Sequence, residues 1–173
     1  MRRSMNVAAR LIPDLAEADK NFVRIMWDQF SRYPGGKKLF SQVISRAAPY
    51  TATIGATVEE LEVGRSRVTM ADRRAVRNHL RCVHAIALAN LVELTGNVAL
   101  AYSLPDDARF IVAGMDLDYV KKARGLITGI CDCPVIDSSE KREFLVPVEL
   151  FDPNGEVVVR GRLRTLVGPK KRR

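Results

Sequence analysis

The sequence lacks the features that mark several large classes of protein. No stretch reaches the ~18 consecutive apolar residues of a membrane-spanning helix, and the N-terminus has no apolar block like that of a secretory signal. Three cysteines are too few for a disulfide framework and favour a reducing compartment, so we expect a cytoplasmic protein. A glycine-rich phosphate loop and a serine nucleophile elbow are also missing, which argues against nucleotide hydrolysis and serine hydrolase chemistry.

The body of the chain lacks net positive charge, although the net charge of the 173 residues is +8. Residues 1–51 carry nine Lys and Arg against four Asp and Glu, whereas residues 52–169 carry fifteen against sixteen. The last four residues, 170–173, are all basic. Because only the two ends could attract a polyanion, we expect no specific nucleic-acid partner. A nucleic-acid- or membrane-associated protein that acts through these ends remains a third hypothesis for the function.

Composition and hydrophobic pattern divide the chain into three segments: an N-terminal helical extension (1–51), a main domain (52–169) and a basic tail (170–173). Apolar residues at helical spacing predict one helix over 19–33, stopped by the Pro-Gly-Gly sequence at 34–36, and a second that ends before Pro49. The polar faces of these helices mix both signs of charge, which favours docking on the protein's own surface over lying on a membrane.

The hydrophobic pattern of the main domain predicts six strands around one buried helix. Residues 53–63 and 65–71 have the pattern of two strands, and residues 83–103 form the most apolar segment, without proline, typical of a buried helix. Four more strands are expected at 109–121, 124–134, 142–151 and 156–167, with a hairpin turn at Asp152-Pro153-Asn154-Gly155. An antiparallel sheet wrapped around one helix satisfies this order, so the expected fold class is α+β.

Glu93 interrupts the apolar helix and is the first candidate for catalysis. A buried carboxyl group has a raised pKa, which suits a general base, but a structural ion pair in a crevice fits the spacing equally well. The start of the same helix offers free N–H groups that can hold an oxyanion, and Ala85 leaves room for a ligand there. The two positions lie eight residues apart, about 12 Å along a helix. If both act on one carbonyl group, they must belong to two chains packed about a two-fold axis.

The pattern Asn78, His84-Ala85 and Glu93 resembles the motif of the hotdog-fold acyl-CoA thioesterases of the phenylacetate-degradation type. That motif is Asn-x5-His-Gly-x7-Asp/Glu, and every interval fits; the stretch NHLRCVHAIALANLVELTGNVAL also resembles a hotdog subfamily catalogued as a domain of unknown function. The resemblance covers about residues 52–167. It implies a hotdog fold and a hydrolase in which Glu93 is the base or nucleophile and Ala85 N–H polarises the thioester carbonyl. It also implies that Asn78 orients the water or the carbonyl and that His84 braces the loop.

Several further assignments follow from this resemblance and from the neighbouring residues. The family's Gly-Gly is Ala85-Ile86 here, so that Ile86 narrows the approach, and Asn97 shares the helix face of Glu93 and could hold the water. Phosphates of coenzyme A call for basic residues at the pocket mouth. One hairpin clusters Lys121, Lys122 and Arg124, and the loop before the helix is rich in arginine: Arg73, Arg74, Arg77 and Arg81.

We therefore expect a homodimer or homotetramer (a dimer of dimers) that hydrolyses an acyl-CoA thioester, with coenzyme A as part of the substrate and no separate cofactor. The pair Cys131 and Cys133, even with Cys82, His79 and His84, is a weak zinc motif, so no metal site is expected. A non-catalytic protein that binds acyl groups or acyl-CoA on the same fold is the alternative, and Glu93 distinguishes the two.

Overall fold

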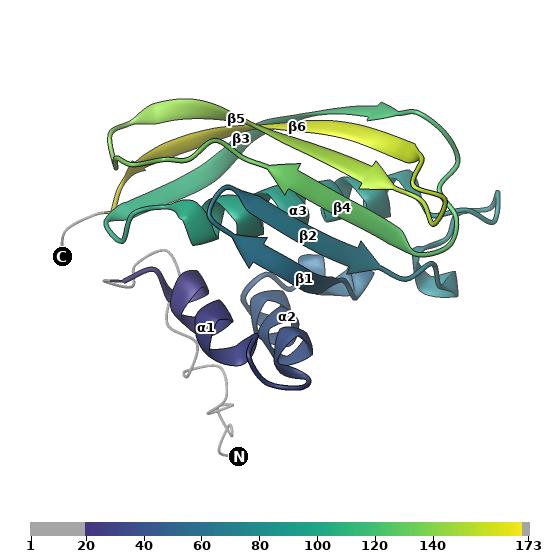
Figure 1. Ribbon diagram of the computed structural model, residues 1–173. Coiled ribbons are helices and arrows are strands. Elements are labelled where there is room, and N and C mark those ends of the chain that lie inside the picture. Colours follow the sequence, from purple (N-terminus) through teal and green to yellow (C-terminus); the bar gives the residue numbers. More distant parts are fainter. Residues whose placement is uncertain (1–19, 171–173) are drawn as a thin grey trace, which may run out of the picture.

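A computed structural model describes residues 20–170, in which a curled antiparallel sheet wraps around one long helix (Figure 1). The helical elements are α1 (Phe22–Phe30), α2 (Gly36–Ala47), the 3-10 turns η2 (Thr51–Ile54) and η3 (Arg74–Val76), and α3 (Ala85–Ser103). The strands are β1 (Thr57–Glu62), β2 (Arg65–Met70), β3 (Ala108–Tyr119), β4 (Ile127–Asp132), β5 (Arg142–Phe151) and β6 (Val157–Pro169). The α+β class expected from the sequence is confirmed.

The six strands form one sheet in the order β1-β2-β4-β5-β6-β3, with every pair antiparallel. All six predicted strands are present, but β1 and β4 have 6 residues each where the patterns over 53–63 and 124–134 predicted longer strands. β1 begins at Thr57 rather than at residue 53, because η2 occupies the preceding residues and ends at Gly55 in the left-handed conformation. The predicted hairpin joins β5 to β6, where Asp152 Oδ1 accepts the N–H groups of Asn154 and Glu156.

Helix α3 lies in the concave face of the sheet, and most of its residues are buried. By length and mean hydropathy it could cross a membrane, but its burial in this core accounts for the same composition. The helix presses closely on the sheet: a Cβ atom added to Gly161 of β6 would lie 2.5 Å from Val92, and one added to Gly129 of β4 would lie 2.5 Å from Thr95. Glycine is therefore required at the centre of the sheet to let the helix approach.

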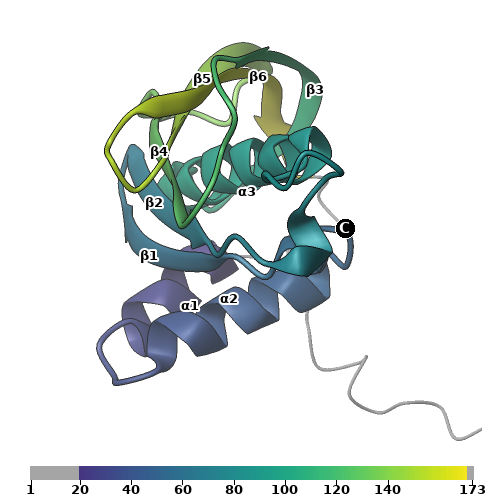
Figure 2. The same ribbon diagram turned by 90° about the vertical axis from the view of Figure 1, so that its right-hand side faces the viewer.

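The N-terminal helices cover the side of α3 that the sheet leaves open (Figure 2). α1 packs on α2 and α3, and α2 packs on β1, as the mixed charges of their polar faces predict. Trp27 and Phe40 are buried in an edge-to-face pair with ring centres 5.1 Å apart, within the same core as the sheet residues. Predictions about residues 1–19 and 171–173 fall outside the described residues.

Candidate active site

The start of α3 presents a backbone donor with no acceptor among residues 20–170, the N–H group of Ala85. His84 caps the helix, because its Nδ1 accepts the N–H of Ile86 at 3.1 Å. The backbone N–H of His84 also donates to Val76 O at 2.8 Å, which fixes the loop before the helix. The Ala85 N–H lies at the positive end of the helix dipole, where an oxyanion is stabilised.

Asn78 organises the loop that leads into the helix. Its Oδ1 accepts the N–H of Leu80 at 2.9 Å and the N–H of Cys82 at 3.4 Å, and its own N–H donates to Cys82 O at 2.9 Å. Arg81, inside this loop, adopts a left-handed conformation with φ of 55°. Since the side-chain oxygen of Asn78 is engaged within the loop, only its Nδ2 group remains for a water or a carbonyl oxygen.

Glu93 is half-buried near the middle of α3 and makes no hydrogen bond or ion pair within the part of the chain that the structure describes. The structural ion pair that the spacing allowed therefore has no partner in residues 20–170. A carboxylate without a partner on a largely buried helix is free to accept a proton from water or to attack a carbonyl carbon.

Two carboxamides lie beside Glu93 on the same face of α3, since residues three or four apart on a helix are neighbours. The Oδ1 atoms of Asn90 and Asn97 are buried without a hydrogen-bond partner among the described residues. Asn90 Nδ2 donates to Tyr50 O at 3.3 Å, and Asn90 lines a pocket of about 180 Å³ together with His84 and Ile86. Buried acceptors are normally paired, so these two oxygens are available to a donor on a ligand or to water.

Asn90 and Tyr119 were not identified from the sequence. The signal for Asn90 was present, because it is a polar residue three positions before Glu93 in an apolar helix. Tyr119 had no comparable signal: its hydroxyl group donates to Ala85 O at 3.1 Å from the far end of β3, a contact between residues 34 apart. Burial raises the pKa of Tyr119, so this hydroxyl stays protonated and ties the end of β3 to the start of α3.

The structure places Ala85 and Glu93 on one continuous helix, as expected. Eight residues of helix separate them by about 12 Å along the axis. One chain therefore cannot bring both groups to the same carbonyl carbon.

The predicted basic residues are used in different ways. Lys121 forms ion pairs with Asp152, at 2.8 Å, and with Glu156, and these hydrogen bonds raise the pKa of Lys121. Lys121 is thus engaged within the chain. Lys122 is exposed and has no hydrogen bond or ion pair within residues 20–170.

Arg124 lies with Arg77 and Arg81 around a surface pocket of about 480 Å³. Asp72 holds Arg77 there with an Nε–Oδ1 distance of 2.6 Å and also accepts the N–H of Gly125. The hydrogen bond with Arg77 holds the pKa of Asp72 below its usual value. Neither Arg81 nor Arg124 has a carboxylate within 4 Å in the described part of the chain, so both can meet an anionic group.

All three cysteines are buried, unpaired thiols. The hydrogen bond with Cys133, together with burial, raises the pKa of Cys131, while Cys82 Sγ lies 3.4 Å from Asn78 Oδ1. Within residues 20–170 no three His, Cys, Asp or Glu side chains converge in a way that could hold a metal ion.

Comparisons with known proteins agree with this architecture. Residues 36–167 match the family model described as a domain of unknown function, DUF4442. The structural-genomics protein APC5556 is 32% identical with a TM-score of 0.75, and the match covers 86% of this chain and 99% of that chain.

Two further solved structures share the fold at lower identity. A Pseudomonas aeruginosa protein described as a probable thioesterase is 24% identical with a TM-score of 0.69, over 79% of this chain and 97% of its own. A thioesterase from Haemophilus influenzae is 13% identical with a TM-score of 0.68, over 79% and 92%. No curated protein matches the chain. The predicted hotdog fold is confirmed, and the chain belongs to the family described as domain of unknown function DUF4442.

Proposed function

We propose that the protein hydrolyses acyl-CoA thioesters, with Glu93 as the general base. The observation that carries this proposal is the half-buried Glu93 carboxylate, which has no partner within residues 20–170 and lies on the central helix of a hotdog fold. The thioesterases that share the fold support hydrolysis of a thioester in general. The spacing of Asn78, His84 and Glu93 supports the specific roles.

In the proposed reaction, Glu93 takes a proton from a water molecule whose oxygen attacks the thioester carbonyl carbon. The carbonyl oxygen becomes an oxyanion, which accepts a hydrogen bond from the N–H of Ala85 of the partner subunit. The carbon–sulfur bond then breaks, and the proton held by Glu93 passes to the departing sulfur. Direct attack by the Glu93 carboxylate, with later hydrolysis of the anhydride, satisfies the same geometry. Asn97 Oδ1 is one turn away and can accept a hydrogen bond from the water.

The shared site requires a homodimer, alone or as a dimer of dimers, and the sheet offers a surface for one. β3 is an edge strand of 12 residues that, among residues 20–170, pairs only with β6, so the backbone groups on its other edge have no strand partner there. Long exposed edges attract a second strand. Two β3 edges that pair antiparallel about a two-fold axis also place the two α3 helices antiparallel, which brings Ala85 of one chain toward Glu93 of the other.

Coenzyme A, rather than a carrier protein, is favoured as the acyl carrier by one arginine before α3 and one between β3 and β4. Arg81 and Arg124 border one pocket, and guanidinium groups suit phosphate recognition. Val83 N–H donates to Ala123 O, so the segment that carries Arg124 is tied to the residues just before α3. The proposal places the reaction in the cytoplasm, as the cysteine usage predicts.

The test is the release of free thiol from a panel of acyl-CoA substrates by the wild-type, Glu93→Gln and Glu140→Gln proteins. Glu93→Gln keeps the size of the side chain but removes the basic oxygen, so kcat should fall by about 10²–10⁴ with the fold intact. Glu140 is exposed and lies outside the site, so its variant should match the wild type. Undiminished turnover by folded Glu93→Gln would exclude the mechanism. Acyl-CoA binding without hydrolysis by the wild type would favour the non-catalytic binding protein.

A further inference from the structure

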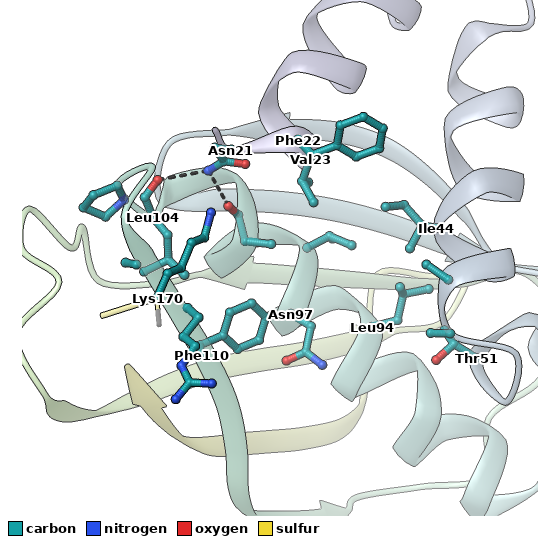
Figure 3. A pocket seen from close by; sticks show the side chains of 17 residues that line it. Asn21, Phe22, Val23, Ile44, Thr51, Leu94, Asn97, Leu104, Phe110 and Lys170 are labelled. Carbon is teal, nitrogen blue, oxygen red and sulfur yellow. Dashed lines mark hydrogen bonds between the residues drawn. The ribbon is translucent and has the colours of Figure 1, made fainter. Parts of the chain in front are cut away.

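An apolar cavity of about 320 Å³ lies between the N-terminal helices and the second half of α3 (Figure 3). Its wall is formed by Phe22 and Val23 of α1, Ile44 of α2, Val98 and Ala101 of α3, and Phe110 of β3. The cavity is thus built by α1 and α2 together with the sheet domain, and α1 precedes the residues that match the family model. Its volume is at the lower end of the range of about 300–1,000 Å³ that small-molecule sites occupy.

The side of the cavity formed by the start of α1 is fixed by hydrogen bonds to the end of α3. Asn21 Nδ2 donates to Ala101 O at 2.7 Å and to Leu104 O at 2.9 Å, and these bonds are visible in Figure 3. Arg24 Nη2 also donates to Leu104 O, at 2.6 Å. The last carbonyl groups of a helix have no partner within the helix, so α1 supplies the donors that they need. Hydrogen bonds as well as apolar contacts therefore hold α1 against the end of α3.

One polar group inside the cavity connects it to the candidate active site. Asn97 lines the cavity, and its Oδ1 is buried without a partner among the described residues. Glu93 lies one turn earlier on the same helix face, about 6 Å along the axis. Arg109 and Lys170 also border the cavity, where their long apolar stems can cover apolar surface. The cavity thus joins a polar group near the proposed base to an apolar interior.

We infer that this cavity holds the tail of an aliphatic acyl chain of about eight to twelve carbons. The estimate compares the length of an extended chain, about 1.2 Å per bond, with the length of helix that lines the cavity, about 1.5 Å per residue. The lining runs along α3 from Leu94 to Ala101 and on to Leu104, the residue after the helix, a span of about 15 Å. The inference rests on the proposed function, since it names the acyl group that the thioester presents to Glu93. Chain-length preference is then set by α1 and α2.

Ala101→Leu tests the inference, because it adds three carbon atoms inside an existing space instead of a packed core. Ala52→Leu adds the same atoms on the exposed turn η2 and is the matched control. The measurements are hydrolysis of butanoyl-CoA and decanoyl-CoA by the full chain, and calorimetric titration with decanoic acid. The wild type and Ala52→Leu should prefer decanoyl-CoA and bind decanoic acid. Ala101→Leu should lose about tenfold in kcat/KM for decanoyl-CoA and in affinity for decanoic acid, the effect of displacing about two methylene groups, with butanoyl-CoA changed less than about twofold.

The outcomes separate this inference from the proposed function. Binding of decanoic acid that Ala101→Leu weakens, in a protein that hydrolyses no thioester, would support the cavity and refute the hydrolase. Equal handling of decanoyl-CoA and decanoic acid by Ala101→Leu and the wild type would overturn the inference. An equal loss toward butanoyl-CoA and decanoyl-CoA would overturn it as well, because the effect would then lie at the reacting carbonyl.

Discussion

Replacement of Gly161 by alanine should destabilise the protein through a clash between the sheet and α3. The new Cβ would lie 2.5 Å from Val92 Cγ1 and 3.1 Å from Leu117 Cδ2. Carbon atoms in ordinary contact are about 3.5–4.0 Å apart, so Val92 would have to retreat by about 1 Å. Val92 is fully buried and its branched side chain has few alternative rotamers. Overpacking of this kind costs about 1–3 kcal/mol, and the reduced freedom of the unfolded chain returns about 0.4–1 kcal/mol of it.

The same strand provides a matched control, because a Cβ added to Gly168 would meet no atom within 4 Å. Gly168→Ala should therefore be neutral or stabilising by up to about 1 kcal/mol. Urea denaturation at a fixed protein concentration measures both free energies of unfolding. A double variant, Gly161→Ala with Val92→Ala, should lose less than the sum of the single losses. Equal stability of Gly161→Ala and Gly168→Ala would refute close packing of α3 on the centre of the sheet.

Two other perturbations test the loop before α3 and the basic C-terminus. Asp72→Asn removes the negative charge beside Arg77 and leaves one acceptor oxygen where two serve Arg77 and the Gly125 N–H, so the free energy of unfolding should fall by about 1–3 kcal/mol at pH 7. The folded state lowers the pKa of Asp72. The wild type should therefore have a higher free energy of unfolding than Asp72→Asn above the unfolded pKa of about 3.9, and this difference should be lost as the pH falls through the lower, folded-state pKa. Denaturation curves at several pH values check this, and a stability difference between the two proteins that does not shrink as the pH falls below about 3.9 would contradict it. A chain that ends at Lys170 should keep acyl-CoA hydrolysis within a few-fold of the full chain and lose any weak, salt-sensitive retention of nucleic acid. Tight, salt-resistant nucleic-acid binding by the full chain would instead support a protein that acts through its basic ends.

The secondary structure of the sheet domain could be predicted because its patterns are local. The apolar run at 83–103 contains α3, and in the strand predicted over 156–167 the exposed Arg160, Arg162 and Arg164 alternate with buried residues. Errors were confined to the ends of elements. η2 replaced the start of β1, and the strand expected over 124–134 is β4 (Ile127–Asp132), after Gly125 in the left-handed conformation.

Contacts between distant segments could not be predicted in the same way. Lys121 has the sequence context of a phosphate-binding residue, yet Asp152 and Glu156, more than 30 residues later, fold back against it. The cavity beside Asn97 exists because Asn21 reaches Leu104, and no spacing within either segment reveals that contact. Local periodicity therefore locates the helix that carries Glu93, whereas the surroundings of that helix depend on three-dimensional packing.

The oxyanion donor can be removed without disturbing the helix, by Ala85→Pro. Proline has no N–H and is well tolerated at the first position of a helix. His84 already has the extended conformation that a residue before proline prefers, with φ of −66° and ψ of 139°. The Ala85 N–H has no acceptor within residues 20–170, so no hydrogen bond of the described chain is lost. Ala85→Pro should therefore fold and be nearly inactive.

Mixing this variant with Glu93→Gln tests most directly whether two chains share one catalytic site. Each variant alone should release almost no thiol from acyl-CoA. In a mixed dimer, Ala85 of the Glu93→Gln chain faces Glu93 of the Ala85→Pro chain, so one of the two sites is intact. After equal mixing, unfolding and refolding, half of the dimers are mixed, and we predict about a quarter of the wild-type activity. Inactivity of the mixture, in a sample shown to contain mixed dimers, would contradict the shared site and the proposed mechanism with it.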